Sequence, residues 1–155
     1  MGNRAVIVSK NSVIEINGRK AINPYAIGVY LHWNGGRDSV EGFLAYCDIQ
    51  GYRMPSADRS YGFARLTQTI ANYFDSGLSV GVDLAMNLDC DNWDNGVYII
   101  DRWNIVDRMY FDGEEQTDYP LRDMLIEINN KQPAGIQVTE EEIDKYIEKM
   151  NTPFN

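Results

Sequence analysis

The sequence predicts an α+β fold with a mainly antiparallel sheet, two inserted helices and an acidic C-terminal helix. Three observations lead to this prediction: short runs rich in β-branched residues, two middle segments with helical spacing of apolar residues, and a capping-box pattern near the C-terminus. A chain of 155 residues with 44% apolar residues has the size and composition of one domain with a real core. We expect residues 1–133 to form a single globular domain, and residues 134–155 to form a linker and the acidic helix.

The N-terminal part of the chain is predicted to be β-structure. The runs "RAVIVSK" and "SVIEI" are typical of short strands. Asn17-Gly18 follows the second run and favours a tight turn, because both residues tolerate positive φ. Residues 26–33 are expected to form another strand, with alternate apolar residues on one face: Ile27, Val29 and Leu31.

Two helices are predicted next. In the first, Asp38 or Ser39 is expected to cap a helix after the turn Asn34-Gly35-Gly36. The second helix is predicted within "YGFARLTQTIANYF". The apolar stripes of the two helices are Val40, Phe43, Leu44 and Cys47, and then Phe63, Leu66, Ile70 and Phe74.

The second half of the chain is predicted to return to the sheet and then end in helices. The segment "LSVGVDLAM" is expected to be a strand, and "VYIIDRWNIVDRMYF" a hairpin or a bent strand pair. "YPLRDMLIEINN" has Pro120 where a helix start tolerates it. Thr139 and Glu142 form a capping-box pattern ahead of the terminal helix.

Charge is distributed unevenly along the chain. The net charge of −9 divides into +3 for residues 1–65 and −12 for residues 66–155. A protein this acidic is repelled by the DNA backbone, so we expect no direct duplex binding. A basic protein is one interpretation of the partner, and the alternative is that the acidity only keeps the protein soluble. The sequence contains neither a membrane-spanning apolar run nor a signal-peptide pattern, which favours a cytoplasmic protein with no membrane partner. Its oligomeric state is left open.

The stretch "YLHWNGGRDSVEGFL" runs from a strand through two glycines to a helix N-terminus. Free backbone N–H groups there, with Arg37 beside them, suit an anion. The stretch matches neither phosphate-binding glycine motif, so simple chain reversal is the main interpretation. The alternative is a nucleotide or phosphate site in which a folded-back loop adds further arginines: Gly35, Gly36, Arg37, Arg53, Arg59 and Arg65.

Candidates for catalysis or metal binding are few. His32 is the single histidine and is interpreted as a structural, hydrogen-bonded side chain, with a Cys–His pair as the alternative. Cys47 and Cys90 belong to no CxxC motif and are expected to be reduced structural thiols. The loop "DCDNWDNG" lacks the spacing of an EF-hand, although a weak calcium site is the alternative to a polar turn. We therefore predict no catalytic residues, no metal and no cofactor.

A resemblance to known proteins adds a functional expectation. "YLHWNGGRDSVEGFL" and "DNGVYII" resemble small uncharacterised proteins encoded by phages and prophages of gut-type Firmicutes, over most of residues 4–133. That group is similar in character to anti-CRISPR inhibitors, many of which are acidic and occupy a basic nucleic-acid channel. The resemblance implies an anti-defence inhibitor in the host cytoplasm and carries over no catalytic residues.

Three hypotheses follow from these observations. The favoured one is a non-enzymatic inhibitor that binds a basic host defence protein, such as a CRISPR effector nuclease, through its acidic half. The second is a nucleotide- or phosphate-binding protein, for example a sponge for a defence signal, and the third is a structural or regulatory phage protein without a ligand. The carboxylates predicted to bind the partner are Asp112, Glu114, Glu115, Asp118, Glu140, Glu141 and Glu142.

Overall fold

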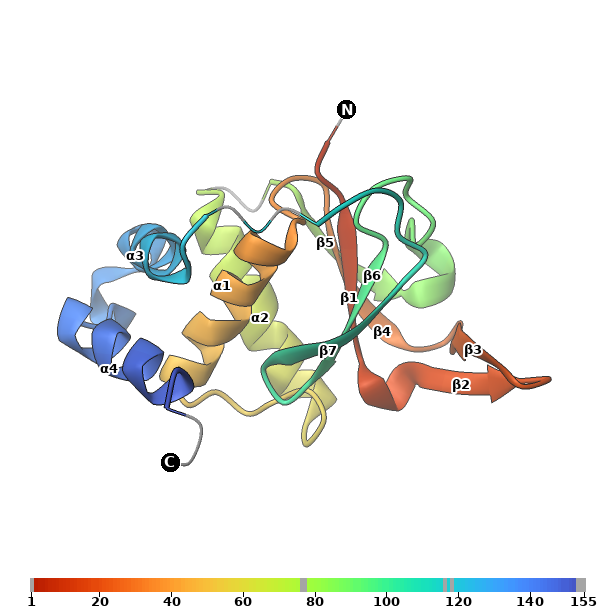
Figure 1. Ribbon diagram of the computed structural model, residues 1–155, viewed down its shortest axis with the longest axis horizontal. Helices are drawn as coiled ribbons and strands as arrows, with labels where there is room; N and C mark the ends of the chain where they lie inside the picture. The colour runs from red at the N-terminus through yellow and green to blue at the C-terminus, as the bar shows by residue number, and fades with distance from the viewer. Residues whose placement is uncertain (1, 76–77, 116, 118, 153–155) are drawn as a thin grey trace.

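A five-stranded sheet forms the centre of the molecule (Figure 1). The structure is a computed structural model that describes residues 2–75, 78–115, 117 and 119–152. The strands lie in the order β5-β4-β1-β6-β7. The central pair β1 and β6 is parallel, whereas the other three pairs are antiparallel. The strand bounds are β1 Ala5–Ser9, β4 Ile27–Leu31, β5 Val80–Leu84, β6 Val97–Asp101 and β7 Asn104–Met109.

Within the described residues, four helices complete the fold and confirm the predicted α+β class. They gather on one side of the sheet in Figure 1, and α1 and α2 are inserted between β4 and β5 as expected. The helix bounds are α1 Arg37–Ile49, α2 Arg59–Tyr73, α3 Leu121–Lys131 and α4 Glu140–Met150. The described part of the chain also has three single-turn 3-10 helices: η1 Lys10–Ser12, η2 Ala85–Asn87 and η3 Ala134–Ile136.

The predicted cap of α1 was wrong. Gly36, not Asp38 or Ser39, is the N-cap residue, and it makes no side-chain capping bond. The Asp38 carboxylate instead accepts from the Ser39 backbone N–H at 2.7 Å, one residue further on. Asn34 donates to the Ser39 hydroxyl at 3.1 Å, which ties the preceding turn to the first helical turn. Polar side chains therefore stabilise this end, but from within the helix.

The two faces of the sheet are covered unequally. On the helix side, Ile7, Leu31 and Tyr98 are fully buried beneath the helices in the main core. The opposite face has a small apolar cluster of four buried residues: Val6, Val8, Val97 and Ile99. A separate hairpin, β2 Val13–Ile16 with β3 Arg19–Ile22, and the loop after η2 contribute partly buried residues to that cluster. The loop that leads into β6 and the segment that follows β7 lie next to this less covered face.

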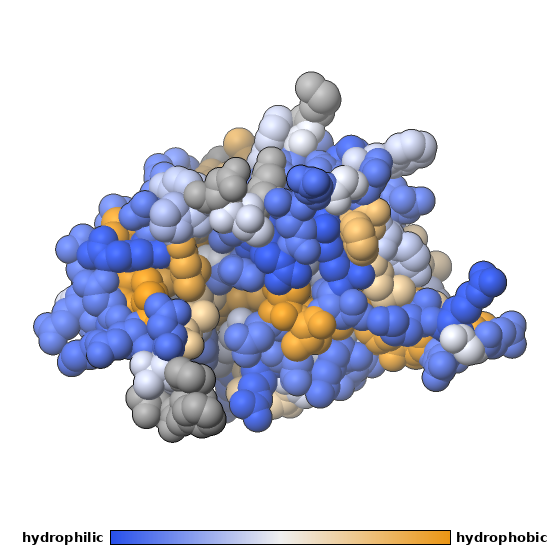
Figure 2. All heavy atoms as spheres, in the orientation of Figure 1, coloured by the Kyte–Doolittle hydropathy of each residue, from blue (hydrophilic) through white to orange (hydrophobic). Residues whose placement is uncertain are grey.

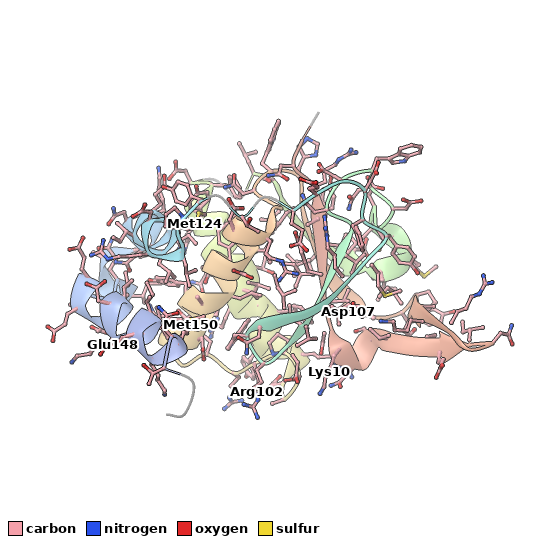
Figure 3. The ribbon with its side chains drawn as sticks, in the orientation of Figure 1. Lys10, Arg102, Asp107, Met124, Glu148 and Met150 are labelled. Carbon is pink, nitrogen blue, oxygen red and sulfur yellow. The ribbon has the colours of Figure 1, made fainter. Side chains whose placement is uncertain are left out.

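The hairpin is also tied to the sheet by charged side chains. Lys20 of β3 donates to Asp107 of β7, and Lys10, in η1 just before the hairpin, donates to Asp101 at 3.0 Å. Figure 3 labels Lys10 and Asp107 on this side of the molecule. Exposed ion pairs contribute about 0–1 kcal/mol each, so they orient the hairpin more than they stabilise it.

The terminal helix α4 packs against the same core as α1 and α3. Ile143 is fully buried there, and burying an isoleucine side chain contributes roughly 1.5–3 kcal/mol. The expected capping box forms between Thr139 and Glu142. Tyr146 donates to Asp48 of α1 at 2.9 Å, which adds a polar link. Figure 2 shows apolar side chains gathered over α3 and α4 and over β7 on an otherwise largely hydrophilic face.

Candidate interaction surface

The loop that leads into β6 presents an aromatic side chain in an unusual backbone conformation. Trp93 is 79% exposed and has a φ of +59°. A bulky residue rarely adopts this left-handed region, because its Cβ crowds the backbone. Such strain costs of the order of 1 kcal/mol or more and persists only where the surrounding structure enforces it.

Asn92 and Gly96 enforce the shape of this loop. Asn92 is fully buried; its side-chain amide donates to the Asp89 carbonyl at 3.0 Å and to the Gly96 carbonyl at 3.1 Å. Its side-chain oxygen accepts from the Gly96 N–H at 3.0 Å. Gly96 itself has a φ of +70°, and a Cβ there would lie 2.2 Å from the Met109 carbonyl oxygen. The loop is thus fixed from inside while Trp93 points to solvent.

The segment that follows β7 lies beside this loop, as Figure 1 shows and a backbone hydrogen bond confirms. The Asp112 N–H donates to the Asp94 carbonyl at 2.9 Å. Tyr110 and Phe111 are both exposed, and Tyr110 also has a positive φ, of 56°. A depression of about 280 Å³ joins the two segments, with Met86, Asp91 and Tyr110 among its lining residues.

We call these exposed side chains the acidic–aromatic surface. It consists of Met86, Asp91, Trp93, Tyr110, Phe111, Asp112 and Glu114. Residues 85–115 carry eight carboxylates and two arginines. One of these arginines, Arg108, is only 8% exposed, and the other, Arg102, lies in the turn between β6 and β7, at the opposite end of β7 (Figure 3). The solvent-facing charge around the aromatic side chains is therefore negative.

The structure separates the carboxylates that the sequence predicted to act together. Asp112 and Glu114 are exposed on the acidic–aromatic surface. Glu115, in contrast, forms an ion pair with Arg37 and a second one with Arg108, whose guanidinium nitrogen lies 3.5 Å from the Glu115 carboxylate. Asp118 lies outside the described residues. The other predicted carboxylates occupy the first turn of α4 at the far end of the molecule (Figure 1): Glu140, Glu141 and Glu142. Two of these three already have a role within α4, since Glu141 pairs with Lys145 at 3.3 Å and Glu142 completes the capping box.

The glycine turn before α1 is tightly packed and its arginine is already paired. A Cβ on Gly35 would lie 2.5 Å from the Asn3 carbonyl oxygen, so this position requires glycine for close approach of the backbone. Arg37 donates to the carboxylates of Glu115 and Glu41. The hydrogen bonds that Arg37 donates to Glu115 are the main cause that raises the pKa of Arg37 above its ordinary value.

The four arginines expected to share an anion pocket do not all meet. Arg53 and Arg65 line one depression of about 400 Å³ together with Tyr61, whereas Arg37 and Arg59 are not among its lining residues. Arg37 begins α1, whereas Arg53, Arg59 and Arg65 lie beyond its other end, after a helix of 13 residues that spans about 20 Å. Arg53 pairs with Asp58 at 3.3 Å and lies 5.1 Å from the centre of the Tyr61 ring. The clustering in sequence therefore does not become one pocket in space.

The histidine and the cysteines lie in separate environments. The Tyr30 hydroxyl is 3.1 Å from His32 Nδ1, and the Trp33 ring packs edge-on against the imidazole at 5.3 Å. Cys47 is fully buried in the core, and burial raises the pKa of its thiol to about 12. Cys90 is half-buried beside the depression described above, and its thiol pKa is raised by burial and then by Asp89. Within the described residues no Cys–His pair forms.

Two of the three aspartates of the loop "DCDNWDNG" lie beside an arginine. Arg4 lies 3.7 Å from Asp89 and 4.0 Å from Asp94, and its backbone N–H donates to Asp94 at 2.9 Å. Across the described part of the chain, no three His, Cys, Asp or Glu side chains converge as metal ligands would. None of the described helices has the length and apolar character needed to cross a bilayer.

No family model, curated protein or solved structure matches the chain. Sequence reasoning missed the aromatic members of the acidic–aromatic surface: Trp93, Tyr110 and Phe111. A tryptophan within a loop of aspartate, asparagine and glycine was the available signal, because a loop that cannot bury an indole must expose it.

Proposed function

We propose that the protein is a non-enzymatic binding protein whose acidic–aromatic surface docks on a basic surface of another protein. The observation that carries this proposal is the exposed Trp93, on a loop that Asn92 holds from inside and that is hydrogen-bonded to the segment carrying Tyr110. Asp91, Asp112 and Glu114 are exposed on the same two segments. Aromatic anchors supply most of the energy at protein interfaces, and opposite charge speeds association. A loop fixed before binding also loses less conformational entropy when the complex forms.

Within this class, we propose an anti-defence inhibitor made by a phage and acting in the host cytoplasm. Its partner would be a host defence protein with a basic nucleic-acid channel, such as a CRISPR effector nuclease. Carboxylates set on a rigid surface can occupy cationic sites that otherwise bind phosphates. Both the acidic–aromatic surface and the resemblance to phage and prophage proteins support this assignment.

DNA cleavage by a panel of purified CRISPR effector nucleases tests the proposal. We expect the protein to inhibit at least one nuclease when added before the DNA, and to inhibit less when the nuclease already holds its target. Trp93→Ala and Tyr110→Ala should each weaken inhibition at least tenfold, as loss of an interface anchor does. Tyr61→Ala is the matched control, because Tyr61 is an exposed aromatic residue on α2 away from the surface.

Two results would contradict the proposal. One is that no nuclease in the panel is inhibited or bound at low salt, where charge attraction is strongest. The other is that inhibition is the same for Trp93→Ala, Tyr110→Ala and the wild type. The alternative of a nucleotide site at Gly35, Gly36 and Arg37 has less support, because Arg37 is already paired with Glu41 and Glu115.

A further inference from the structure

A second surface, at the β5 edge of the sheet, has the features of a peptide-binding site. The β5 strand pairs with β4 on one side and is the last strand of the sheet. An edge strand can accept an additional strand when its outward backbone groups and neighbouring side chains are accessible. Three independent features of this edge indicate that it binds an extended peptide.

The hydrogen-bond pattern shows which backbone groups of β5 point outward. Ala85 N–H donates to the Ala26 carbonyl at 2.7 Å, and His32 N–H donates to the Ser79 carbonyl at 2.8 Å. Because antiparallel ladders alternate, every second residue between these two pairs also faces β4. The remaining residues, Val80, Val82 and Leu84, therefore direct their N–H and C=O groups away from the sheet.

The side of β5 that faces α2 carries an apolar depression. It has a volume of about 700 Å³ and lies between β4, β5 and the first half of α2. Its lining includes Ile27, Phe63 and Val82, with the 71% exposed Tyr25 at its border. A residue opposite Val82 in an added strand would direct its side chain to the same face as Val82, and thus toward this depression.

Charge indicates what kind of peptide fits. Arg59 lines the same depression, is exposed, and has no hydrogen-bond or ion-pair partner among the described residues. A free guanidinium beside an apolar depression favours a carboxylate on the bound segment. Asp83 is the one carboxylate on β5, and its side chain lies on the opposite face of the sheet from Val82. It already accepts hydrogen bonds from the Leu84 N–H at 2.6 Å and from the Asn87 side-chain amide at 3.1 Å.

We propose that the β5 edge binds an extended segment of a partner protein, with apolar residues at alternate positions and a carboxylate that reaches Arg59. The segment adds a strand through the outward backbone groups of Val80 and Val82. Its apolar side chains enter the depression beneath α2. This site is distinct from the acidic–aromatic surface and takes the opposite kind of charge.

Selection from a display library of random linear peptides tests the site. We expect the wild-type protein to enrich peptides that alternate apolar residues and contain an acidic residue. The enriched peptide, synthesised with blocked ends, should bind about tenfold more weakly to Arg59→Gln, as loss of a charged hydrogen bond implies. Arg65→Gln is the matched control, since Arg65 is also exposed on α2 but lines a different depression.

Val82→Pro, compared with Val82→Ala, separates strand addition from simple side-chain contact, because both variants shorten the side chain that lines the depression and only proline removes the N–H. Because the Val82 N–H points outward, proline removes no bond within the sheet, and the variant should keep its far-ultraviolet circular dichroism. Peptide binding should be lost in this variant. The proposal is overturned if the library enriches no peptide, or if enriched peptides bind Val82→Pro and Arg59→Gln as tightly as the wild type. The peptide proposal is also overturned if the wild type forms dimers as its concentration rises while Val82→Pro stays monomeric. A second copy of the chain, and not a partner peptide, would then bind the β5 edge.

Discussion

Arg37 and Glu115 join the first residue of α1 to the segment that follows β7. Arg37 donates to the Glu115 carboxylate through both its Nε and Nη2 atoms. Arg108 approaches the same carboxylate at 3.5 Å, and its guanidinium lies over the rings of Tyr98 and Phe111. Glu115 therefore pairs with two arginines at the place where the acidic–aromatic surface meets the helical layer.

Replacing Glu115 tests this structural role. Glu115→Gln keeps the size of the side chain but leaves Arg108, which is 8% exposed, without its negative partner. Unpairing a largely buried charge is unfavourable, and we expect a loss of about 1–3 kcal/mol in the free energy of unfolding. Urea unfolding measures this loss of stability. Glu114→Gln, one residue earlier and exposed, should change stability by less than about 0.5 kcal/mol, and an equal loss in both variants would contradict the assigned role.

The buried side chain of Asn92 leads to a second prediction about stability. This side chain supplies three hydrogen bonds to the backbone of its own loop. Asn92→Ala removes all three and should lower the free energy of unfolding by about 2–3 kcal/mol. Hydrogen exchange at the Gly96 amide should also become faster than at amides in β1. Unchanged stability and exchange would mean that the loop holds its shape without Asn92.

The two thiols are predicted to differ in reactivity. Only the thiolate reacts with aromatic disulfide reagents, and burial raises the pKa of Cys47 to about 12. At pH 8 the folded protein should therefore react at Cys90 alone, slowly, and at Cys47 only when it unfolds. Counting modified thiols with and without urea checks this. Rapid modification of Cys47 in the folded protein would show that α1 opens without global unfolding.

Local patterns in the sequence predicted most elements of the fold but not how distant segments meet. The alternating Ile27, Val29 and Leu31 form one face of β4, and Asn17-Gly18 forms the turn between β2 and β3. Periodicity and turn chemistry are local properties, so one sequence reveals them. The parallel pairing of β1 with β6 depends on contacts between residues about 90 positions apart, which no local pattern encodes.

The candidate sites were harder to predict for the same reason. A cluster of charges in the sequence does not say which members are neutralised, and Arg37 and Glu115 neutralise each other across 78 positions. Asp112 and Glu114 are exposed and can contact a partner, whereas the Glu115 carboxylate is already paired with Arg37. The exposed Trp93 depends on a loop shape set by Asn92 and Gly96, so only the three-dimensional structure shows that this indole faces solvent on a hydrogen-bonded loop.

The backbone strain at Trp93 leads to a prediction that can be tested on the isolated protein, without a binding partner. At a φ of +59° a residue with a Cβ is strained, whereas glycine is not. Trp93→Gly and Trp93→Ala both remove the exposed indole, so their comparison isolates the backbone effect. We expect the glycine variant to be more stable than the alanine variant by about 1 kcal/mol, measured by urea unfolding at one pH. Equal stabilities, or a more stable alanine variant, would mean that the loop relaxes when the indole is removed. In that case Trp93 would itself help to set the loop shape, and the loop could not be a rigid platform that exists before the partner binds.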